Sequence, residues 1–234
     1  METERCLAFI NCELKLPESP APGGKPRPSK LAVTLSRQAG SGAWLVAKRL
    51  AEYLDQHAPG ESCRWTVFDK ELVEKVLEDH NLPKKLAHYM PEDRVSAIDD
   101  MMHEILGLHP PSWTLVRQTT ETILKLAELG HVILIGRGAN VITGRLEHVF
   151  HVRLVGSLEK RLARVQEHLK LDQRAAMEFI VKSDRGRQRY VKEHFKVDVE
   201  NPLLYDLVIN TDRQACLDAA VLIGEAMLRR AAAR

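Results

Sequence analysis

The stretch that decides the fold reads Leu31-Ala-Val-Thr-Leu-Ser36-Arg37-Gln38-Ala-Gly40-Ser41-Gly42-Ala43-Trp44-Leu-Val-Ala-Lys48-Arg49-Leu50. Its first five residues form a short apolar run with β-branched side chains, which is typical of a buried strand. Residues 36–42 are a glycine-containing loop, and from Ala43 onward the apolar positions recur at helical spacing. A strand, a glycine loop and a helix in this order direct backbone N–H groups and a helix N-terminus towards an anion, usually a phosphate.

The loop departs from the full phosphate-binding pattern GxxxxGK[ST], known as Walker A. That pattern places a lysine on the terminal phosphates and a hydroxyl group on magnesium. If Gly42 takes the last glycine, Ala43 stands where the lysine belongs and Trp44 where the hydroxyl belongs. On spacing alone, a phosphate site and an ordinary strand-to-helix turn remain alternatives, so the loop needs support from elsewhere in the chain.

Composition bounds the class of protein. The 234 residues suffice for one α/β domain with an inserted lobe, and the formal charge of +2 gives no strong indication of nucleic acid. The start does not resemble a signal peptide, and no apolar run reaches transmembrane length. We expect a cytoplasmic protein that binds small molecules, without nucleic-acid or membrane partners; a homo-oligomer stays open. Four scattered cysteines are expected as reduced thiols: Cys6, Cys12, Cys63 and Cys216.

Proline and glycine content predicts the domain boundaries. Residues 1–29 form an N-terminal segment, in which an apolar run at 6–10 would add an edge strand and 17–29 is a proline- and glycine-rich linker. The domain itself spans 30–234. Within it, about 70–130 carries no convincing strand signal and is punctuated by prolines, which predicts a helical insert that serves as a substrate lobe.

Short apolar strands alternate with helices along the domain. Strands are expected at 31–35, 65–68, 131–135, 149–155 and 207–210. This alternation predicts an α/β fold, a three-layer sandwich in which a five-stranded parallel sheet has helices on both faces. Ligands of such sheets bind at the carboxyl ends of the strands.

Gly136-Arg137-Gly138 follows the third expected strand and should lie at that ligand-binding edge. The glycines allow a ligand to approach the backbone, and the arginine can form a two-pronged contact with a phosphate. The alternative for Arg137 is a structural ion pair at the end of the strand.

An arginine-rich segment, about 172–195, is predicted to act as a lid. Lys182, Arg185, Arg189 and Lys192 share one helix face, where like charges repel one another. A solvated basic face is the ordinary interpretation of such a run. Because the segment accompanies a glycine loop and a glycine-flanked arginine, the three features together favour a polyphosphate ligand.

Five motifs stand in order along the chain. They are Ser36-Arg37-Gln38-x-Gly40-Ser41-Gly42, Phe68-Asp69-Lys70-Glu71-Leu72, Gly136-Arg137-Gly138-Ala139, Ser183-Asp184-Arg185-x-Arg187-x-Arg189-Tyr190 and Tyr205-Asp206-Leu207-Val208-Ile209-Asn210-Thr211-Asp212. In this order and spacing the chain resembles the cytidylate kinase-like family from about residue 31 to its C-terminus. The family is similar to bacterial cytidylate kinases, which are P-loop kinases that transfer the γ-phosphoryl group of ATP to CMP or dCMP with magnesium.

The resemblance implies a P-loop kinase fold, the cofactors ATP and Mg²⁺, and roles for single residues. The residues that would bind the ATP phosphates are Ser36, Gln38, Gly40, Ser41 and Gly42. Those on the monophosphate side are Asp69 and Arg137. Phosphoryl transfer depends mostly on positioning and on neutralising charge, so positively charged side chains are the candidate catalytic groups. These are Arg37 in the loop and the lid arginines Arg185, Arg187 and Arg189.

Departures from the cytidylate kinase pattern leave two functions open. Cytidylate kinases carry an aspartate where this chain has Gly136, and their lid aspartate falls at Gly186. The first hypothesis is a nucleotide kinase of cytidylate-kinase type that acts on a nucleoside monophosphate. The second is a catalytically weak nucleotide-binding regulatory protein on the same fold. A binder of polyphosphate or nucleic acid through the arginines alone is disfavoured by the near-neutral charge.

Overall fold

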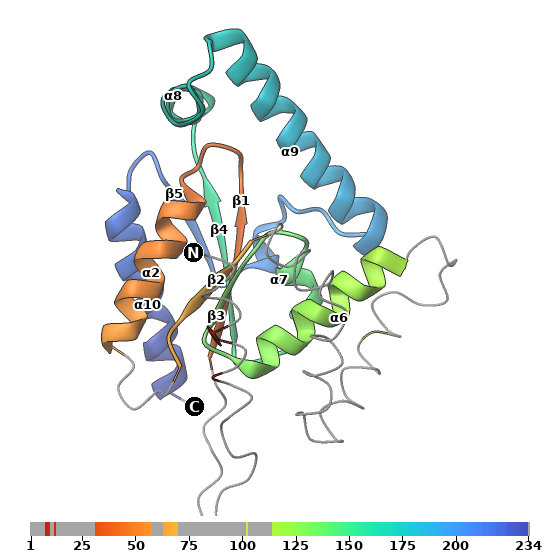
Figure 1. Ribbon diagram of the computed structural model, residues 1–234, viewed down its shortest axis with the longest axis vertical. Coiled ribbons are helices and arrows are strands. Elements are labelled where there is room, and N and C mark those ends of the chain that lie inside the picture. Colours follow the sequence, from red (N-terminus) through yellow and green to blue (C-terminus); the bar gives the residue numbers. More distant parts are fainter. Residues whose placement is uncertain are drawn as a thin grey trace, which may run out of the picture.

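The structure is a computed structural model that describes residues 8, 9, 12, 31–57, 63–69, 102 and 114–233. They form three layers, with a parallel sheet between two layers of helices (Figure 1). The strands are β1 (Ala32–Arg37), β2 (Thr66–Phe68), β3 (Val132–Ile135), β4 (Val149–Val155) and β5 (Leu207–Asn210). The helices are α2 (Ala43–His57), α6 (Thr114–Leu129), α7 (Ala139–Ile142), α8 (Leu158–Leu169), α9 (Gln173–Phe195), the 3-10 helix η2 (Pro202–Leu204) and α10 (Cys216–Ala232). The predicted α/β sandwich is confirmed.

β1 is the central strand of the five-stranded sheet. The order is β2-β3-β1-β4-β5, and every neighbouring pair is parallel. Leu35 pairs with Ile135 of β3 on one side and with Val152 of β4 on the other. Because parallel strands end at one edge of a sheet, the loops that follow β1, β3 and β4 meet there. The topology therefore brings the glycine loop next to residues 136–138.

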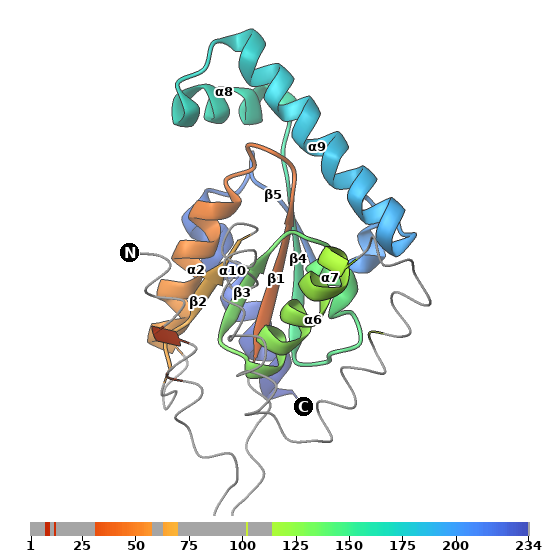
Figure 2. The same cartoon turned by 45° about the vertical axis from the view of Figure 1, so that its right-hand side comes forward.

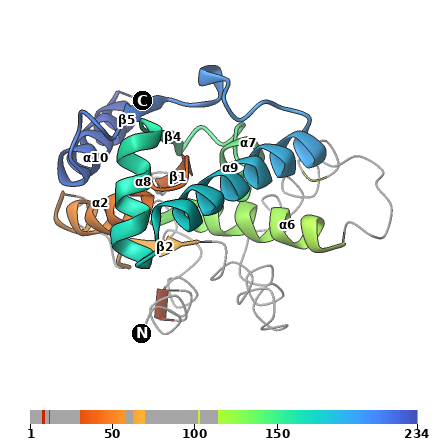
Figure 3. The ribbon, with the colours of Figure 1, turned by 90° about the horizontal axis from the view of Figure 1, so that it is seen from above.

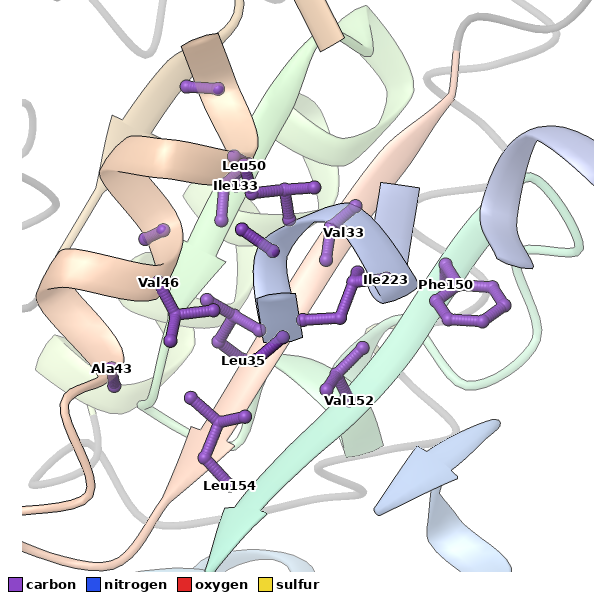
Figure 4. Close-up of a cluster of buried hydrophobic side chains, with 14 of the residues drawn as sticks. Val33, Leu35, Ala43, Val46, Leu50, Ile133, Phe150, Val152, Leu154 and Ile223 are labelled. Carbon is purple, nitrogen blue, oxygen red and sulfur yellow. The ribbon is translucent and has the colours of Figure 1, made fainter. Parts of the chain in front are cut away.

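Apolar packing on both faces fixes β1 in place. On one face Val33 and Leu35 pack with Ile133, Val152 and Ile223 beneath α2 and α10 (Figure 4). The other face is covered by a second cluster that includes α6, α7 and the C-terminal part of α9. Full burial of one large apolar side chain contributes about 1.5–3 kcal/mol. The strand that carries the glycine loop is thus held by apolar packing on both of its faces.

α8 and α9 lie over the carboxyl ends of the strands (Figures 2 and 3). Ser157 caps α8 and Asp172 caps α9, and each side chain accepts a hydrogen bond from a backbone N–H three residues on. Ala39 of the glycine loop packs in a small cluster with Val165 of α8 and Ile180 of α9. Both helices are therefore anchored directly on the loop.

Some sequence predictions differ from the structure at the ends of the chain. The apolar run at 6–10 was expected as an edge strand, but Ala8 and Phe9 are helical, so this expectation is wrong for these two residues. Phe9 is buried and packs edge-to-face on Phe68, with 5.8 Å between ring centroids. The last helix begins at Cys216, and residues 211–213 form a turn before it.

Two predicted segments fall largely outside the described residues. The linker at 17–29 lies wholly outside them. Of the helical insert at 70–130, the structure describes Met102 and the residues from 114 on, where α6 forms its last helix.

Cys12 and Cys63 form a disulfide, so the expectation of reduced thiols is wrong for this pair. The two residues are 51 positions apart in sequence, and their Cα atoms lie 6.0 Å apart. Cys12 lies near the N-terminus and Cys63 just before β2, so the spacing of the cysteines in the sequence does not reveal that they pair. Cys216 is a free thiol.

Reduction of this disulfide should lower the free energy of unfolding by about 2–4 kcal/mol, because the bond restricts a long loop in the unfolded chain. Chemical denaturation with and without reductant measures the change. A variant with both Cys12→Ser and Cys63→Ser is the control and should not respond to reductant. Equal stability of the wild-type protein in both conditions would contradict the prediction.

Candidate functional site

The loop between β1 and α2 has a backbone that demands glycine. Gly40 has φ +77° and Gly42 has φ +80°, which is the left-handed region that other residues rarely adopt. A Cβ atom on Gly40 would lie 2.5 Å from the carbonyl oxygen of Arg161 in α8. Glycine is therefore required here both by the turn and by the close approach of α8.

The loop presents polar groups without protein partners. Among the described residues, no backbone or side-chain acceptor takes the N–H groups of Gly40, Gly42, Ala43 or Trp44. The hydroxyl group of Ser41 is also buried without a partner in this part of the chain. Free N–H groups in a glycine loop and at the start of a helix are groups that can donate to an anion, which would complete these hydrogen bonds.

Two side chains of the loop hold it to its neighbours. Gln38 accepts a hydrogen bond from the backbone N–H of Gly156 at 3.0 Å. The Ser36 hydroxyl accepts from Arg153 at 2.8 Å and from Tyr205 at 3.1 Å. These contacts hold the loop against β4 and against Tyr205, which lies just before β5.

Asp184 of α9 contacts the loop with both carboxylate oxygens. Oδ1 accepts from the backbone N–H of Ala39 at 2.7 Å and from Arg187 at 2.9 Å. Oδ2 accepts from Arg161 at 2.7 Å. Arg161 is 8% exposed and also donates to the Ala39 carbonyl at 3.0 Å. One carboxylate thus links the glycine loop, α8 and α9.

A hollow of about 580 Å³ lies between the loop, residues 136–138 and α9. Its positively charged side chains are Arg37, Arg137, Arg153, Lys182 and Arg187, and its carboxylates are Asp184 and Glu200. Arg153 is 3% exposed and is held by an ion pair to Glu200. The excess of positive charge and the volume suit a phosphorylated small molecule.

Arg37 lies in the most crowded part of this hollow. The pKa of Arg37 is lowered to about 10, mainly by burial and also by the charges of Arg187 and Arg137, while Asp69 acts in the opposite direction. The guanidinium group still carries its charge at neutral pH. The pKa of Arg187 is also lowered, chiefly by burial. An anion bound between these side chains would relieve their repulsion.

Arg137 is held by an unusual backbone after β3. Gly136, Arg137 and Gly138 have φ values of +82°, +56° and +72° in succession. The guanidinium carbon lies 5.4 Å from the centroid of the Tyr190 ring, which is a cation–π contact with α9. The short helix α7, which the sequence did not predict, begins directly after this turn.

The structure separates the arginines that the sequence groups together. Arg187 faces the loop and the 580 Å³ hollow. Arg185 and Arg189 instead line a separate hollow on the outer side of α9, together with Met177 and Val181. Asp69 stands directly after β2, close enough to Arg37 to influence its pKa.

Sequence reasoning missed three arginines that shape the site. Arg153 interrupts the apolar strand β4, and a charged residue in such a run is a signal of a buried, paired group. Arg161 and Arg164 lie on α8, where they match an ordinary amphipathic pattern. Arg164 donates to the carbonyl of Thr211 at 2.6 Å and thereby connects α8 to the turn before α10.

Among the residues that the structure describes, no group of three or more His, Cys, Asp or Glu side chains is placed to hold a metal ion. Nor is any helix in this part of the chain long and apolar enough to cross a membrane.

The fold and the site define a P-loop kinase architecture, with a parallel sheet in the order β2-β3-β1-β4-β5 and a glycine loop after its central strand. The chain belongs to the cytidylate kinase-like family, whose model matches residues 32–213. The resemblance of the five motifs to this family is thus confirmed.

A solved structure shares the architecture. A protein of uncharacterized function from Eubacterium ventriosum superposes with a TM-score of 0.63 at 19% identity, over 88% of this chain and 99% of that chain. A shikimate kinase from Bacteroides thetaiotaomicron has a TM-score of 0.46 at 13% identity, over 85% and 98%. Among curated proteins, a uronate isomerase of Corynebacterium glutamicum is 29% identical over 116 residues, which are 50% of this chain. The chain spans 22% of the length of that relative.

Gly136→Ala should lower the free energy of unfolding by about 1–3 kcal/mol. The substitution is strained at φ +82°, and the new methyl group would overlap Nη1 of Arg37. Gly186→Ala is the matched control, because a Cβ in this helix meets nothing within 4 Å, and it should raise stability by about 0.5–1 kcal/mol. Urea denaturation compares the two. A neutral effect of Gly136→Ala would show that this turn is not constrained.

Proposed function

We propose that the protein is a nucleotide kinase that transfers the γ-phosphoryl group of ATP to a nucleoside monophosphate, with CMP or dCMP as the first acceptors to test. One observation carries the proposal: four arginines, Arg37, Arg137, Arg153 and Arg187, line one hollow beside a glycine loop whose amide groups at 40 and 42–44 have no acceptor among the described residues. Family membership supports a nucleotide kinase, and the acceptor is an inference from the resemblance.

The donor phosphates would bind along the glycine loop. The backbone N–H groups of Gly40, Gly42, Ala43 and Trp44 would be the donors, and the buried Ser41 hydroxyl group would add one more. Ser36 and Gln38 act through their contacts with the loop's neighbours, because both side chains already have protein partners. The acceptor phosphate would bind on the opposite side of the hollow, at Arg137 and near Asp69.

Charge neutralisation is the main chemical task, and arginines supply it here. Ala43 occupies the position of the usual lysine, so the loop itself contributes only Arg37 as a cation. Arg187 adds a second charge from α9, and both would contact the phosphoryl group as negative charge builds on its oxygens. Arg185 and Arg189 lie on the outer side of α9, and they are proposed to reach the phosphates only after α9 has moved.

Magnesium would be held mainly by the nucleotide. The described residues offer no cluster of three metal-binding side chains, and Trp44 replaces the usual hydroxyl ligand. Mg²⁺ commonly binds substrate phosphates with one or two carboxylates and several waters. When bound, the ion supplies charge neutralisation between the terminal phosphates.

A second candidate function is nucleotide binding for regulation, with weak or no turnover. The specific observation in its favour is that Ala43 and Trp44 replace both side chains of the Walker A tail, while Trp44 is 39% exposed beside the loop. A coupled assay of ADP release against a panel of nucleoside monophosphates separates the two. Turnover with one monophosphate supports the kinase, whereas ATP binding without turnover on any acceptor supports the second function.

Arg137→Ala should abolish monophosphate binding and leave the fold intact. Loss of a charge-assisted contact with phosphate should cost about 2–4 kcal/mol of binding free energy. Calorimetric titration measures the affinity, and Arg49→Ala is the control because Arg49 is a half-exposed arginine of α2 paired with Glu52. Unchanged affinity in a folded Arg137 variant would mean that this arginine has a structural role only.

Arg37→Ala should lower turnover by about a hundredfold and weaken ATP binding far less, because the contact strengthens as charge develops in the transition state. Arg37→Lys should restore only part of the rate, since an ammonium group cannot reproduce the planar fork. Steady-state kinetics and equilibrium ATP binding are compared for each variant. Equal losses in rate and affinity would place Arg37 in ground-state binding instead.

A further inference from the structure

We propose that the backbone N–H of Ala39 together with Arg161 and Arg187 forms the site for the terminal phosphoryl group, and that Asp184 fills this site as an internal anion until a polyphosphate displaces it. The proposal rests on the phosphate-binding role of the glycine loop. It adds Arg161 to the binding groups and gives Asp184 an inhibitory role.

The geometry around Asp184 is that of an oxyanion site. A loop amide and two guanidinium groups, from three different elements, point at two oxygens of one carboxylate at 2.7–2.9 Å. Backbone N–H groups of glycine loops and arginine forks are also the groups that bind phosphate oxygens. A phosphoryl group would satisfy the same donors and would bring a larger negative charge.

The hydrogen bond between Asp184 and Ala39 does not belong to the local structure of α9. Ala39 and Asp184 are 145 residues apart, and Asp184 lies within α9, far from its capped start at Asp172. The carboxylate therefore does not cap its own helix. It accepts a hydrogen bond from an amide of the glycine loop. In the same loop, the amides of Gly40 and Gly42 have no protein acceptor among the described residues.

The Asp184 side chain is accessible enough to be displaced from the Ala39 amide. Its side chain is 22% exposed and lines the 580 Å³ hollow, and the Arg187 side chain is 34% exposed. Gly186 follows two residues later, and a Cβ there would meet nothing within 4 Å, so packing does not require glycine at this position. A glycine inside a helix lowers the cost of bending it. α9 can therefore swing Asp184 away from the loop.

Displacement would couple phosphate binding to the position of α9. While Asp184 is in place, a polyphosphate must replace it, and its apparent affinity is reduced by that competition. After displacement, Arg161 and Arg187 stay with the phosphate, and α9 loses its tie to Ala39.

The test is calorimetric binding of inorganic tripolyphosphate to the full chain. Asp184→Asn keeps the shape of the side chain and removes its charge, so it should bind tripolyphosphate about tenfold more tightly than the wild-type protein. Glu178→Gln is the control: it removes one charge from the other side of α9 and should leave the affinity unchanged. Equal or weaker binding by a folded Asp184→Asn variant would overturn the proposal, as would equal gains in both variants.

A second measurement does not depend on a variant. In the wild-type protein, tripolyphosphate should increase amide hydrogen exchange in α9 around Gly186, because the tie between α9 and Ala39 is lost. Unchanged or slower exchange there would overturn the proposal. Neither readout needs phosphoryl transfer, so a protein without kinase activity that still shows both effects would refute the proposed function and leave this inference standing.

Discussion

The crowding of positive charge at the carboxyl ends of β1, β3 and β4 is the constraint that the rest of the structure accommodates. Arg153 and Arg161 are almost fully buried, and burial lowers the pKa values of Arg37 and Arg187. Guanidinium groups rarely lose their proton in proteins, so their mutual repulsion must be offset by anions. Asp184 and Glu200 are the carboxylates that line the hollow beside them, and a bound phosphate would complete the balance.

Apolar packing of the parallel sheet offsets the repulsion between these positively charged side chains. β1 is buried on both faces, and its large apolar side chains hold the end of the strand against the repulsion of the groups that follow it. Side-chain contacts then fix each neighbour: Gln38 binds the end of β4, and Arg153 joins Ser36 to Glu200. The loop is therefore rigid where it touches protein, and it offers free donors where a ligand would bind.

The sequence predicts the sheet well because each buried strand appears as an apolar run within a few consecutive residues. The apolar runs at Val149–Val155 and Leu207–Asn210 predict strands with the same bounds that the structure shows. Local sequence patterns do not predict which face of α9 packs against the rest of the protein. Helical spacing tells which residues share a face, but only the packing of Ile180 and other apolar residues on the core decides which face looks inward.

Contacts between distant segments also escaped prediction. The Cys12–Cys63 disulfide and the Asp184–Ala39 hydrogen bond join residues 51 and 145 positions apart, and neither pair leaves a periodic signal. The motif at 183–190 predicts ligand-binding roles for its arginines, and it does not indicate a role for the carboxylate of Asp184. The reason is physical: a charge run indicates that an anion is needed, but it does not indicate whether that anion is a ligand or a side chain of the protein itself.

The replacement of the Walker lysine by Ala43 changes how charge reaches the phosphates. A lysine in the loop stays beside the ligand whatever the rest of the molecule does. Here only Arg37 belongs to the loop, while Arg187 is carried by α9 and Arg161 by α8. The positive charge available to a phosphate therefore depends on where these helices lie. Asp184 joins α9 to the loop and contacts the same arginines, so the groups that would neutralise a ligand also link α8 and α9 to the loop.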